Sequence, residues 1–305
     1  MSFFYGMNVM VTGSEGLMGR PLVKALESQG AEVLHYDKTD GFDIMDLNNL
    51  KLSMAEQDVV FHLAAYSGVE HARELGYEAW RVNTMGTLNV LEAARATMPK
   101  AVLTASTNHV YGKQTAHERP TSEDARLSQL DTYSASKIAA DYMARSYWHN
   151  YKVPAVAMRN TNCYGPDDPH LDHIIPGTIT SILEGKRPVI RGVGITSKSY
   201  LYVDDVVDAY LAVAQWTVEN EVGGHAFNVS TEPITVKDLV TEILSVMNSS
   251  LQPIIEGRRS DNQNEDLDWG KIHRMTGWKP KVRLRDGIEK VVNAFALRYL
   301  KAMPR

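Results

Sequence analysis

Tyr133 and Lys137 lie four residues apart in a segment whose pattern predicts a helix, so they share one helix face. A nearby ammonium favours the phenolate form of a tyrosine, and a phenolate can take a proton from a substrate hydroxyl. The chain has 14 tyrosines, so this spacing alone is a weak signal. Its context is stronger, because Ser106-Thr107 follows the predicted strand Ala101–Ala105, at the edge where open α/β sheets bind ligands. Thr107 could share a hydrogen bond with the hydroxyl that Tyr133 deprotonates.

A glycine-rich turn supplies a second chemical feature. The predicted strand Asn8–Thr12 runs into Gly13-Ser14-Glu15-Gly16-Leu17-Met18-Gly19, and a predicted helix follows. Glycines let backbone N–H groups and the positive helix end approach a pyrophosphate. Asp37 ends the second predicted strand, where an acid accepts hydrogen bonds from ribose hydroxyls and repels a 2′-phosphate. Lys38 beside it weakens that repulsion slightly. Together these residues predict a dinucleotide site that favours NAD over NADP.

Taken together, these motifs resemble the extended short-chain dehydrogenase/reductase family, particularly its nucleotide-sugar epimerases and dehydratases. The resemblance covers nearly the whole chain. Its ordered matches are Thr12-Gly13-x-x-Gly16-x-x-Gly19, His62-Leu63-Ala64-Ala65, Asn83 with Gly86-Thr87, Ser106-Thr107-x-x-Val110-Tyr111-Gly112, Tyr133-x-x-x-Lys137, Arg159-x-x-Asn162-x-Tyr164-Gly165-Pro166, Tyr202-Val203-Asp204-Asp205 and Gly277-Trp278-x-Pro280.

The resemblance implies roles for a set of residues. The catalytic residues would be Thr107, Tyr133 and Lys137, with His109 as a further candidate. The expected cofactor-binding residues are Gly13, Gly16, Leu17, Met18, Gly19, Asp37, Lys38, Asp43, Ile44, Leu63, Ala64, Ala65, Asn83, Tyr133 and Lys137. The expected substrate-binding residues are Ser67, Thr107, Asn108, Asn162, Lys198 and Arg259, the last two contacting a diphosphate.

Two positions depart from the family pattern. Lys198 stands where the family commonly has an arginine, which keeps the charge but loses the bidentate fork. Sugar 4,6-dehydratases usually have Asp-Glu after the catalytic threonine, whereas this chain has Asn108-His109. Asparagine cannot donate a proton as a carboxylic acid does. His109 could act as a base or could simply pack against the cofactor edge.

The expected function is therefore an NAD-dependent nucleotide-sugar epimerase that forms a transient keto sugar, oxidised at C4. The alternatives are a 4,6-dehydratase, which a similarity of residues 174–212 to CDP-glucose dehydratases favours, and a keto-sugar reductase. A reductase would usually prefer NADP, which Asp37 disfavours. A non-catalytic NAD-sensing protein is a further alternative, although all three catalytic residues are present.

Alternating apolar strands and helical segments predict an α/β fold, a Rossmann-type doubly wound parallel sheet with a smaller C-terminal substrate-binding domain. The strands expected are Asn8–Thr12, Glu32–Tyr36, Val59–Leu63, Ala101–Ala105, Ala155–Arg159 and Phe227–Val229, and the helices include 17–29, 77–97, 134–151 and 284–302. Residues 1–165, with 203–230 and with the C-terminal helix returning to them, would bind NAD. Residues 166–202 and 231–290 would bind the substrate. The polar stretch 253–266 is expected to be loop.

Composition limits the remaining possibilities. A net charge of −5 gives no basic field for nucleic acid or anionic lipid. The single cysteine, Cys163, and the absence of an apolar leader or membrane span predict a cytoplasmic protein. The Asp- and His-rich stretch 167–173 is placed by the resemblance in a substrate loop, so no metal is expected there.

The resemblance also implies a homodimer, because members of the family commonly dimerise through two helices of each subunit. The side chains of one predicted helix would lie in the core or at this interface; they are Tyr77, Trp80, Leu88, Val90 and Leu91.

Overall fold

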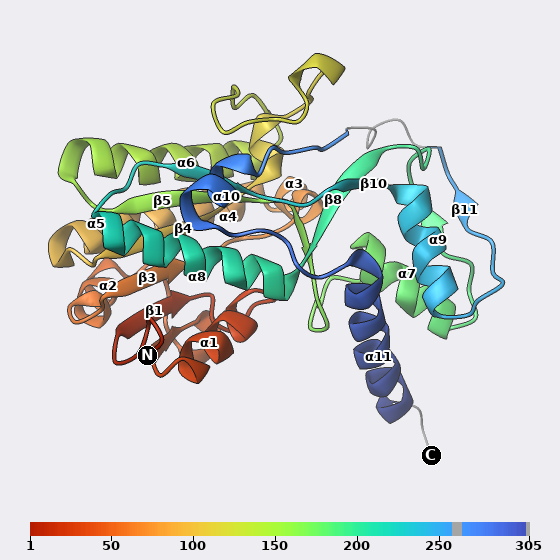
Figure 1. The fold of residues 1–305 in the computed structure, drawn as a ribbon, viewed down its shortest axis with the longest axis horizontal. Helices are drawn as coiled ribbons and strands as arrows, with labels where there is room; N and C mark the ends of the chain where they lie inside the picture. Colours follow the sequence, from red (N-terminus) through yellow and green to blue (C-terminus); the bar gives the residue numbers. More distant parts are fainter. Residues whose placement is uncertain (258–263, 303–305) are drawn as a thin grey trace.

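The computed structural model describes residues 1–257 and 264–302. At its centre lies a six-stranded, all-parallel sheet, with the strand order β2-β1-β3-β4-β5-β9 (Figure 1). The strands are β1 (Asn8–Thr12), β2 (Glu32–Tyr36), β3 (Val59–His62), β4 (Ala101–Thr107), β5 (Ala155–Asn160) and β9 (Ala226–Val229). The predicted doubly wound α/β fold is therefore confirmed. The strand order reverses direction at β1, the place where such sheets open a crevice for ligands.

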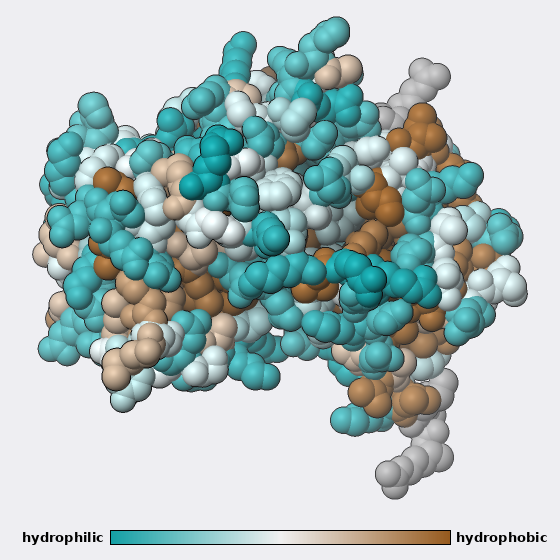
Figure 2. All heavy atoms as spheres, viewed as in Figure 1, coloured by the Kyte–Doolittle hydropathy of each residue, from teal (hydrophilic) through white to brown (hydrophobic). Residues whose placement is uncertain are grey.

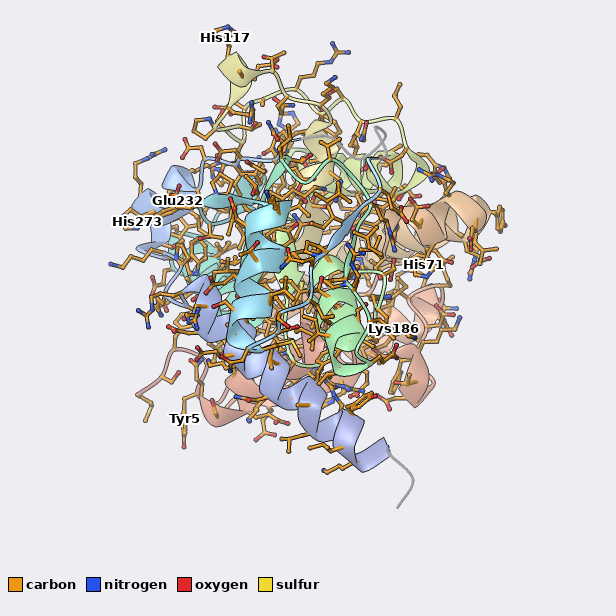
Figure 3. All side chains as sticks on the ribbon, turned by 90° about the vertical axis from the view of Figure 1, so that its right-hand side faces the viewer. Tyr5, His71, His117, Lys186, Glu232 and His273 are labelled. Carbon is orange, nitrogen blue, oxygen red and sulfur yellow. The ribbon has the colours of Figure 1, made fainter. Side chains whose placement is uncertain are left out.

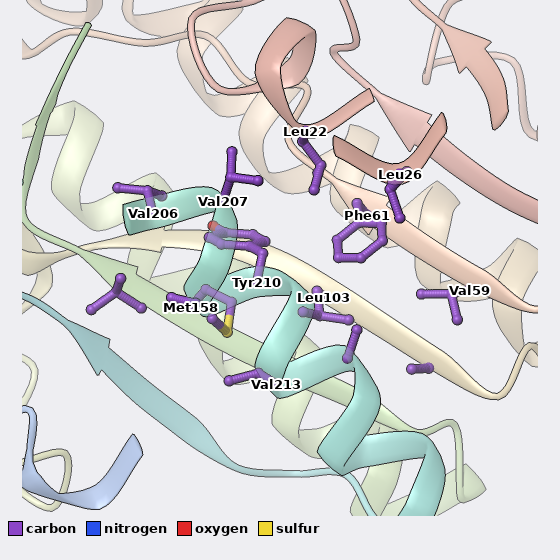
Figure 4. Packing of buried hydrophobic residues seen from close by; sticks show 14 of the residues in the cluster. Leu22, Leu26, Val59, Phe61, Leu103, Met158, Val206, Val207, Tyr210 and Val213 are labelled. Carbon is purple, nitrogen blue, oxygen red and sulfur yellow. The ribbon is translucent and has the colours of Figure 1, made fainter. Parts of the chain in front are cut away.

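Helices cover both faces of this sheet, because alternate side chains of the buried strands point to opposite sides. One face packs against α1 (Gly19–Ser28), α8 (Val203–Asn220) and α10 (Gly270–Thr276). Figure 4 shows this contact, with Phe61 and Met158 of the sheet lying against Tyr210 and Val213 of α8. The other face packs against α2 (Leu47–Met54), α5 (Thr87–Thr97) and α6 (Thr132–Tyr151).

A second, smaller layer lies beyond the carboxyl ends of the central strands. Its strands form one sheet of β10 (Pro233–Thr235), β8 (Ser197–Tyr202) and β6 (Asn162–Tyr164) and another of β11 (Ile254–Ile255) and β7 (Val189–Ile190). Three helices, α7 (Ile174–Leu183), α9 (Val236–Val246) and α11 (Leu284–Ala302), lie side by side (Figure 3). Their contact includes the buried side chains of Ile179, Ile243 and Ile288.

The C-terminal helix belongs with this second layer. Helix α11 packs against α7, α9 and β8, so the sequence-based suggestion that it returns to the nucleotide-binding half is wrong. The element that does return is α10, which contacts α8 and β9. The side chains of Leu297 and Leu300 on α11 are exposed. Figure 2 shows hydrophobic surface, in brown, close to the C-terminal end of the chain.

The helix predicted over 77–97 is interrupted. It consists of α4 (Gly76–Trp80), a π-helical turn at Arg81–Gly86 and α5, and a short helix α3 (Val69–Glu74) precedes it. Short 3-10 turns follow β2 and β4, at Lys38–Asp40 and Asn108–Tyr111, and a third covers Ala116–Glu118. π turns often lie at functional sites, and this one carries the motif residues Asn83 and Gly86. Within the described residues, no helix is long and apolar enough to span a membrane.

Candidate active site

A cavity of about 1170 Å³ opens at the carboxyl ends of the central strands and extends to the second layer. Most of the residues that the sequence singled out line this one space. They are Gly13, Gly16, Leu17, Met18, Gly19, Asp37, Lys38, Asp43, Ile44, Leu63, Ala64, Ala65, Ser67, Thr107, Asn108, His109, Tyr133, Lys137, Asn162 and Lys198. Asn83 is not among the lining residues, and Arg259 lies outside the described part of the chain.

The glycine turn is packed so closely that side chains cannot be added. Gly13 has φ +73°, and a Cβ there would lie 2.7 Å from the backbone nitrogen of Ala64. A Cβ on Gly19 would lie 2.1 Å from the carbonyl oxygen of Gly13. The turn therefore presents bare backbone to the cavity at the start of α1, as a pyrophosphate requires. The hydroxyl of Ser14 is buried with no partner within the described residues, so the turn also holds an unused polar atom.

Asp37 ties the end of β2 to this turn. Its carboxylate accepts a hydrogen bond from the backbone N–H of Glu15 at 3.1 Å and from the N–H and hydroxyl of Thr39 at 3.0 Å. Ile44 lines the cavity further on and packs against Gly86, where a Cβ would lie 2.4 Å from its Cδ1. A carboxylate so fixed can still accept bonds from ribose hydroxyls, and these residues therefore fit an NAD molecule.

Asn83 acts one layer behind the cavity wall. Its side chain donates to the carbonyl of Tyr66 at 3.1 Å and to the Ser136 hydroxyl at 3.0 Å, and it accepts from the Tyr66 N–H at 2.8 Å. It is 1% exposed. It joins the loop after β3 to the helix that carries Tyr133 and so positions both.

The catalytic candidates converge from β4 and α6. Asp131 caps α6, accepting from the Ser134 N–H at 2.9 Å, and so sets where Tyr133 enters the cavity. The side chains of Tyr133 and Thr107 both line the cavity, and Thr107 is close enough to Tyr133 to act on its pKa. Lys137 donates from its Nζ to the carbonyl of Ala105 at 2.8 Å. Strand β4 and helix α6 thus bring together three residues that sequence reasoning grouped as one catalytic unit.

Burial dominates the acid–base state of this unit in the protein alone. Burial raises the pKa of Tyr133 to about 12, although the nearby Thr107 side chain acts in the opposite direction. Burial also lowers the pKa of Lys137 to about 8, with the charge of Asp141 opposing it. The sequence suggested that Lys137 would favour the phenolate, but its ammonium is directed to a backbone carbonyl. Tyr133 is therefore a neutral phenol at pH 7 unless further positive charge reaches it.

A closed polar network holds these elements from behind. Asp141 lies one turn beyond Lys137 and accepts two bonds from Arg159, at 2.8 and 2.9 Å, and one from Ser106 at 3.0 Å. The Arg159 side chain also donates to the Tyr111 hydroxyl at 2.9 Å. The side chains of Asp141 and Arg159 are fully buried. The motif residues Tyr111 and Arg159 therefore position β4, β5 and α6 and do not line the cavity.

The substrate half of the cavity centres on Glu265, which sequence reasoning missed because it lies in a polar stretch predicted to be loop. Asn108 and Asn162 donate from their side-chain amides to the Glu265 carboxylate at 2.6 and 2.9 Å. Lys198 donates to its other oxygen at 3.0 Å. Burial would raise the pKa of Glu265, but the charges of Lys198 and His109 and the bond from Asn162 hold it below its usual range. Glu265 is therefore ionised at neutral pH.

His109 and the stretch 167–173 complete the polar lining. The ring of His109 meets the ring of Tyr133 edge-on, with centroids 6.3 Å apart, which leaves both of its predicted roles open. The carboxylate of Asp168 is buried and is hydrogen-bonded to the ring of His173 at 2.8 Å. Within the described residues, no group of His, Cys, Asp and Glu could hold a metal ion.

Comparison with known proteins agrees with this arrangement. Residues 9–230 match the NAD dependent epimerase/dehydratase family. A UDP-glucose 4-epimerase from Mycolicibacterium smegmatis is 32% identical over 95% of this chain and 98% of its own length. A bovine dTDP-D-glucose 4,6-dehydratase is 26% identical, covering 94% of this chain and 88% of its own. The crystal structure of UDP-glucose 4-epimerase from Thermotoga maritima with UDP-glucose superposes with a TM-score of 0.88, at 26% identity, over 96% of this chain and 99% of that one.

The match extends over more than two thirds of the chain, and it includes the glycine turn, Asp37 and the Thr107–Tyr133–Lys137 unit. These are the residues that the geometry joins in one cavity. The chain therefore belongs to the NAD-dependent epimerase/dehydratase family, and it is an enzyme of nucleotide-sugar processing whose cofactor is NAD.

Proposed function

We propose that this enzyme is a nucleotide-sugar epimerase that inverts a carbon, expected to be C4, through a transient keto sugar. The observation that carries the proposal is the Thr107–Tyr133–Lys137 unit. The residue after Thr107 is an asparagine, Asn108, at the position where a dehydratase has an acid. Epimerisation at an oxidised carbon needs one group that removes and returns a hydroxyl proton. It does not need a separate acid to expel water.

The roles of the residues follow from their places in the cavity. Bound NAD supplies the hydride acceptor and the positive charge that favours the Tyr133 phenolate. Tyr133 takes the proton from the sugar hydroxyl, and Thr107 holds that hydroxyl by a hydrogen bond. Lys137, whose ammonium is held at the carbonyl of Ala105, can hold the ribose next to the nicotinamide. After the keto sugar has turned over in the cavity, the hydride from the reduced cofactor would return to the opposite face of the carbon, and Tyr133 would return the proton to the carbonyl oxygen.

We further propose how the chain divides this work. Residues 1–165 with 203–230 bind NAD, and 166–202 with 231–290 bind the sugar nucleotide. Lys198 lies in that second part and Asn162 lies just before it, in β6; both line the cavity, where they would contact the diphosphate. Asp37 would make NAD the preferred cofactor over NADP, because a 2′-phosphate would meet its carboxylate.

A 4,6-dehydratase is the second candidate, and one contact favours it. The Glu265 carboxylate lies 2.6 Å from the Asn108 amide and so puts a carboxylate back beside the catalytic threonine. Dehydration requires removal of the proton at C5 and protonation of the leaving C6 oxygen. The lowered pKa of Glu265, which is bonded to Lys198, makes it a poor proton donor at neutral pH. Epimerisation therefore remains the better supported reaction.

One experiment separates the two reactions. Purified enzyme with NAD is incubated in D₂O with UDP-glucose, dTDP-glucose and CDP-glucose, and the products are analysed by NMR. Epimerisation should give the C4 epimer without solvent deuterium on carbon, since the proton exchanged is on oxygen. A 4-keto-6-deoxy product carrying deuterium at C5 would refute the epimerase proposal and establish the dehydratase. The absence of any product from a wider panel of sugar nucleotides would refute both.

We also propose a homodimer formed through α4, α5 and α6. The aromatic side chains of Tyr77 and Trp80 on α4, and of Tyr142 and Tyr151 on α6, are exposed, whereas Val90 and Leu91 of α5 are buried in the core. α4 and α5 both contact α6. Exposed aromatic residues are typical of protein interfaces. Sedimentation equilibrium should give twice the chain mass, and Trp80→Glu should shift it towards the monomer.

A further inference from the structure

Three side chains expected to bind the substrate, Asn108, Asn162 and Lys198, all converge on the carboxylate of Glu265. They come from the turn after β4, from β6 and from β8. The side chain of Glu265 is 12% exposed and that of Lys198 is 22% exposed. Both line the cavity, so the pair meets any ligand that enters.

The backbone holds Glu265 in this place. Its N–H donates to the carbonyl of Ser197 at 2.8 Å, and the Ser197 N–H donates to the side chain of Asn264 at 2.9 Å. On the other side, the carbonyl of Asp266 accepts from the Thr121 N–H at 2.8 Å. Two neighbouring residues are thus fixed to different parts of the molecule. The carboxylate therefore reaches Lys198 from a fixed backbone position.

The charge of this carboxylate matters for an anionic ligand. Lys198 is the cation that the family resemblance assigns to the diphosphate, and its charge is already balanced by Glu265. A diphosphate placed on Lys198 would lie within a few ångströms of the carboxylate, where like charges repel strongly in a partly dry cavity. The Lys198 ammonium can serve the ligand fully only if the carboxylate moves away.

Glu265 has other partners when it leaves Lys198. The Asn108 amide already donates to it, and the ring of His109 is close enough for its charge to lower the pKa of this carboxylate. A change of side-chain rotamer alone can move a glutamate carboxylate by a few ångströms, and the backbone bonds of the segment can remain. Asn108 and His109 lie beside Thr107, so such a movement brings the carboxylate towards the sugar end of the cavity.

We propose that Glu265 determines the specificity of the substrate site as an internal counterion: its carboxylate occupies the anion subsite of Lys198 and Asn162, and the diphosphate of the substrate displaces it towards Asn108 and His109. This proposal rests on the proposed function, because it takes the ligand to be a nucleoside diphosphate sugar. Its consequence is a site that discriminates strongly by charge. A ligand without a diphosphate leaves the Lys198–Glu265 pair closed.

The test compares wild-type enzyme with Glu265→Gln, loaded with NAD, by calorimetry against UDP, dTDP, CDP and GDP and against the nucleosides. Glutamine keeps the size of the side chain and can still accept a bond from Lys198, but it carries no charge. We expect the nucleoside diphosphate that binds best to bind at least about tenfold more tightly to Glu265→Gln, with nucleoside affinity unchanged. In a Lys198→Met background, the gain should disappear, because the two residues act as a pair.

A matched control is Glu184→Gln. Glu184 forms an exposed pair with Lys186 at 2.7 Å outside the cavity, so its removal should not change diphosphate affinity. Thermal unfolding and NAD binding check that each variant is folded.

Three results would overturn the proposal. The first is an unchanged or weaker affinity of Glu265→Gln for every nucleoside diphosphate. The second is an equal gain in affinity for the nucleosides, which would show that the substitution acts through the space in the cavity and not through the lost charge. The third is a failure of wild type and variant alike to bind any diphosphate. Failure of the proposed function is recognised separately, by NAD-loaded enzyme that binds a diphosphate but converts no sugar nucleotide.

Discussion

Two carboxylates organise the two halves of the cavity, and they do so in different ways. Asp141, behind the catalytic helix, is paired with Arg159, and both side chains are fully buried. Glu265, in the substrate half, is paired with Lys198, and both side chains reach the cavity. The guanidinium bonds Asp141 through two nitrogens, whereas the ammonium bonds Glu265 through one. The closed pair fixes geometry, and the open pair can exchange a partner for a ligand.

The difference teaches how similar ionic chemistry serves two purposes. A buried pair that loses one member leaves a charge that water cannot reach, so it resists change. A pair at a cavity wall can be solvated when it opens, and a ligand can replace either member. In this enzyme a buried ion pair positions the catalytic residues, and an ion pair at the cavity wall joins the residues expected to contact the substrate.

The largest effect expected is on the catalytic side. Tyr133→Phe keeps the ring in its packing but removes the oxygen that moves the proton. Turnover should fall by about 10²–10⁴-fold, since a general acid–base group contributes an effect of that size. NAD binding and thermal stability should stay close to wild type, which separates chemistry from folding. Activity within a few fold of wild type would remove Tyr133 from the mechanism and make His109 the next base to test.

The next prediction compares the Asp141–Arg159 and Glu265–Lys198 ion pairs by their contributions to the free energy of unfolding. Asp141→Asn leaves the Arg159 guanidinium buried without its counter-charge and should cost about 3–5 kcal/mol of unfolding free energy. Glu265→Gln should cost about 1 kcal/mol or less, because its pair faces the cavity. Urea denaturation of both variants measures the difference. Equal costs would show that the two pairs are not distinct in kind.

A smaller effect, with a defined pH dependence, is expected from Lys137→Met. Burial lowers the pKa of Lys137 to about 8, against an ordinary value of 10.5. Between these values the unfolded chain binds more protons than the folded one, so this lysine makes wild type gain stability as pH rises from 8 to 10.5. Below pH 8 the charged lysine costs up to about 3 kcal/mol. Lys137→Met should therefore be more stable than wild type at pH 7, with an advantage that shrinks towards pH 10.5.

Thermal unfolding at pH 7, 9 and 10.5 follows this advantage. A variant that is less stable at pH 7, or an advantage independent of pH, would show that the bond to Ala105 outweighs the cost of burying the charge.

The smallest effect concerns the cofactor end of the cavity. Asp37→Ala removes the carboxylate that would face a 2′-phosphate, so the preference for NAD over NADP should narrow by about tenfold, or about 1.4 kcal/mol. Asp37 also receives the Glu15 N–H, so a modest loss of NAD affinity should accompany the change. Calorimetry with both cofactors measures the ratio. An unaltered ratio would show that Asp37 supports the glycine turn and has no part in selecting the cofactor.

The sequence predicts the cofactor half of this molecule well, for a physical reason. Strands buried on both faces must be continuous apolar runs, and β1, β3 and β5 are such runs. Only glycine fits at positions 13 and 19, because a Cβ there would clash with the backbone of the turn itself or of the residues after β3. A short sequence motif is therefore enough to predict this turn. Asp37 and the Tyr133–Lys137 pair likewise depend on local spacing.

The substrate half depends on contacts that no short motif contains. Glu265 is 157 residues from Asn108 and 103 from Asn162 along the chain, and it lies in a polar stretch without periodicity. The strands β7, β10 and β11 have two or three residues each, too few to show a pattern. Asn83 belongs to a sequence motif, but its position behind the cavity wall depends on its contacts with Tyr66 and Ser136. Arg259 lies outside the described residues.

Residues near the C-terminus are anchored far from where the chain ends. The indole of Trp278 donates to the carbonyl of Asp205, whose carboxylate accepts from the N–H groups of Lys281 and Val282. Before this point the segment has supplied Glu265 to the cavity, and after it α11 joins the second layer. The chain thus crosses several times between the nucleotide-binding half and the substrate half. Exchanging the substrate half for that of a relative would need several junctions at once, so new specificities in this architecture are more accessible by point substitution than by recombination.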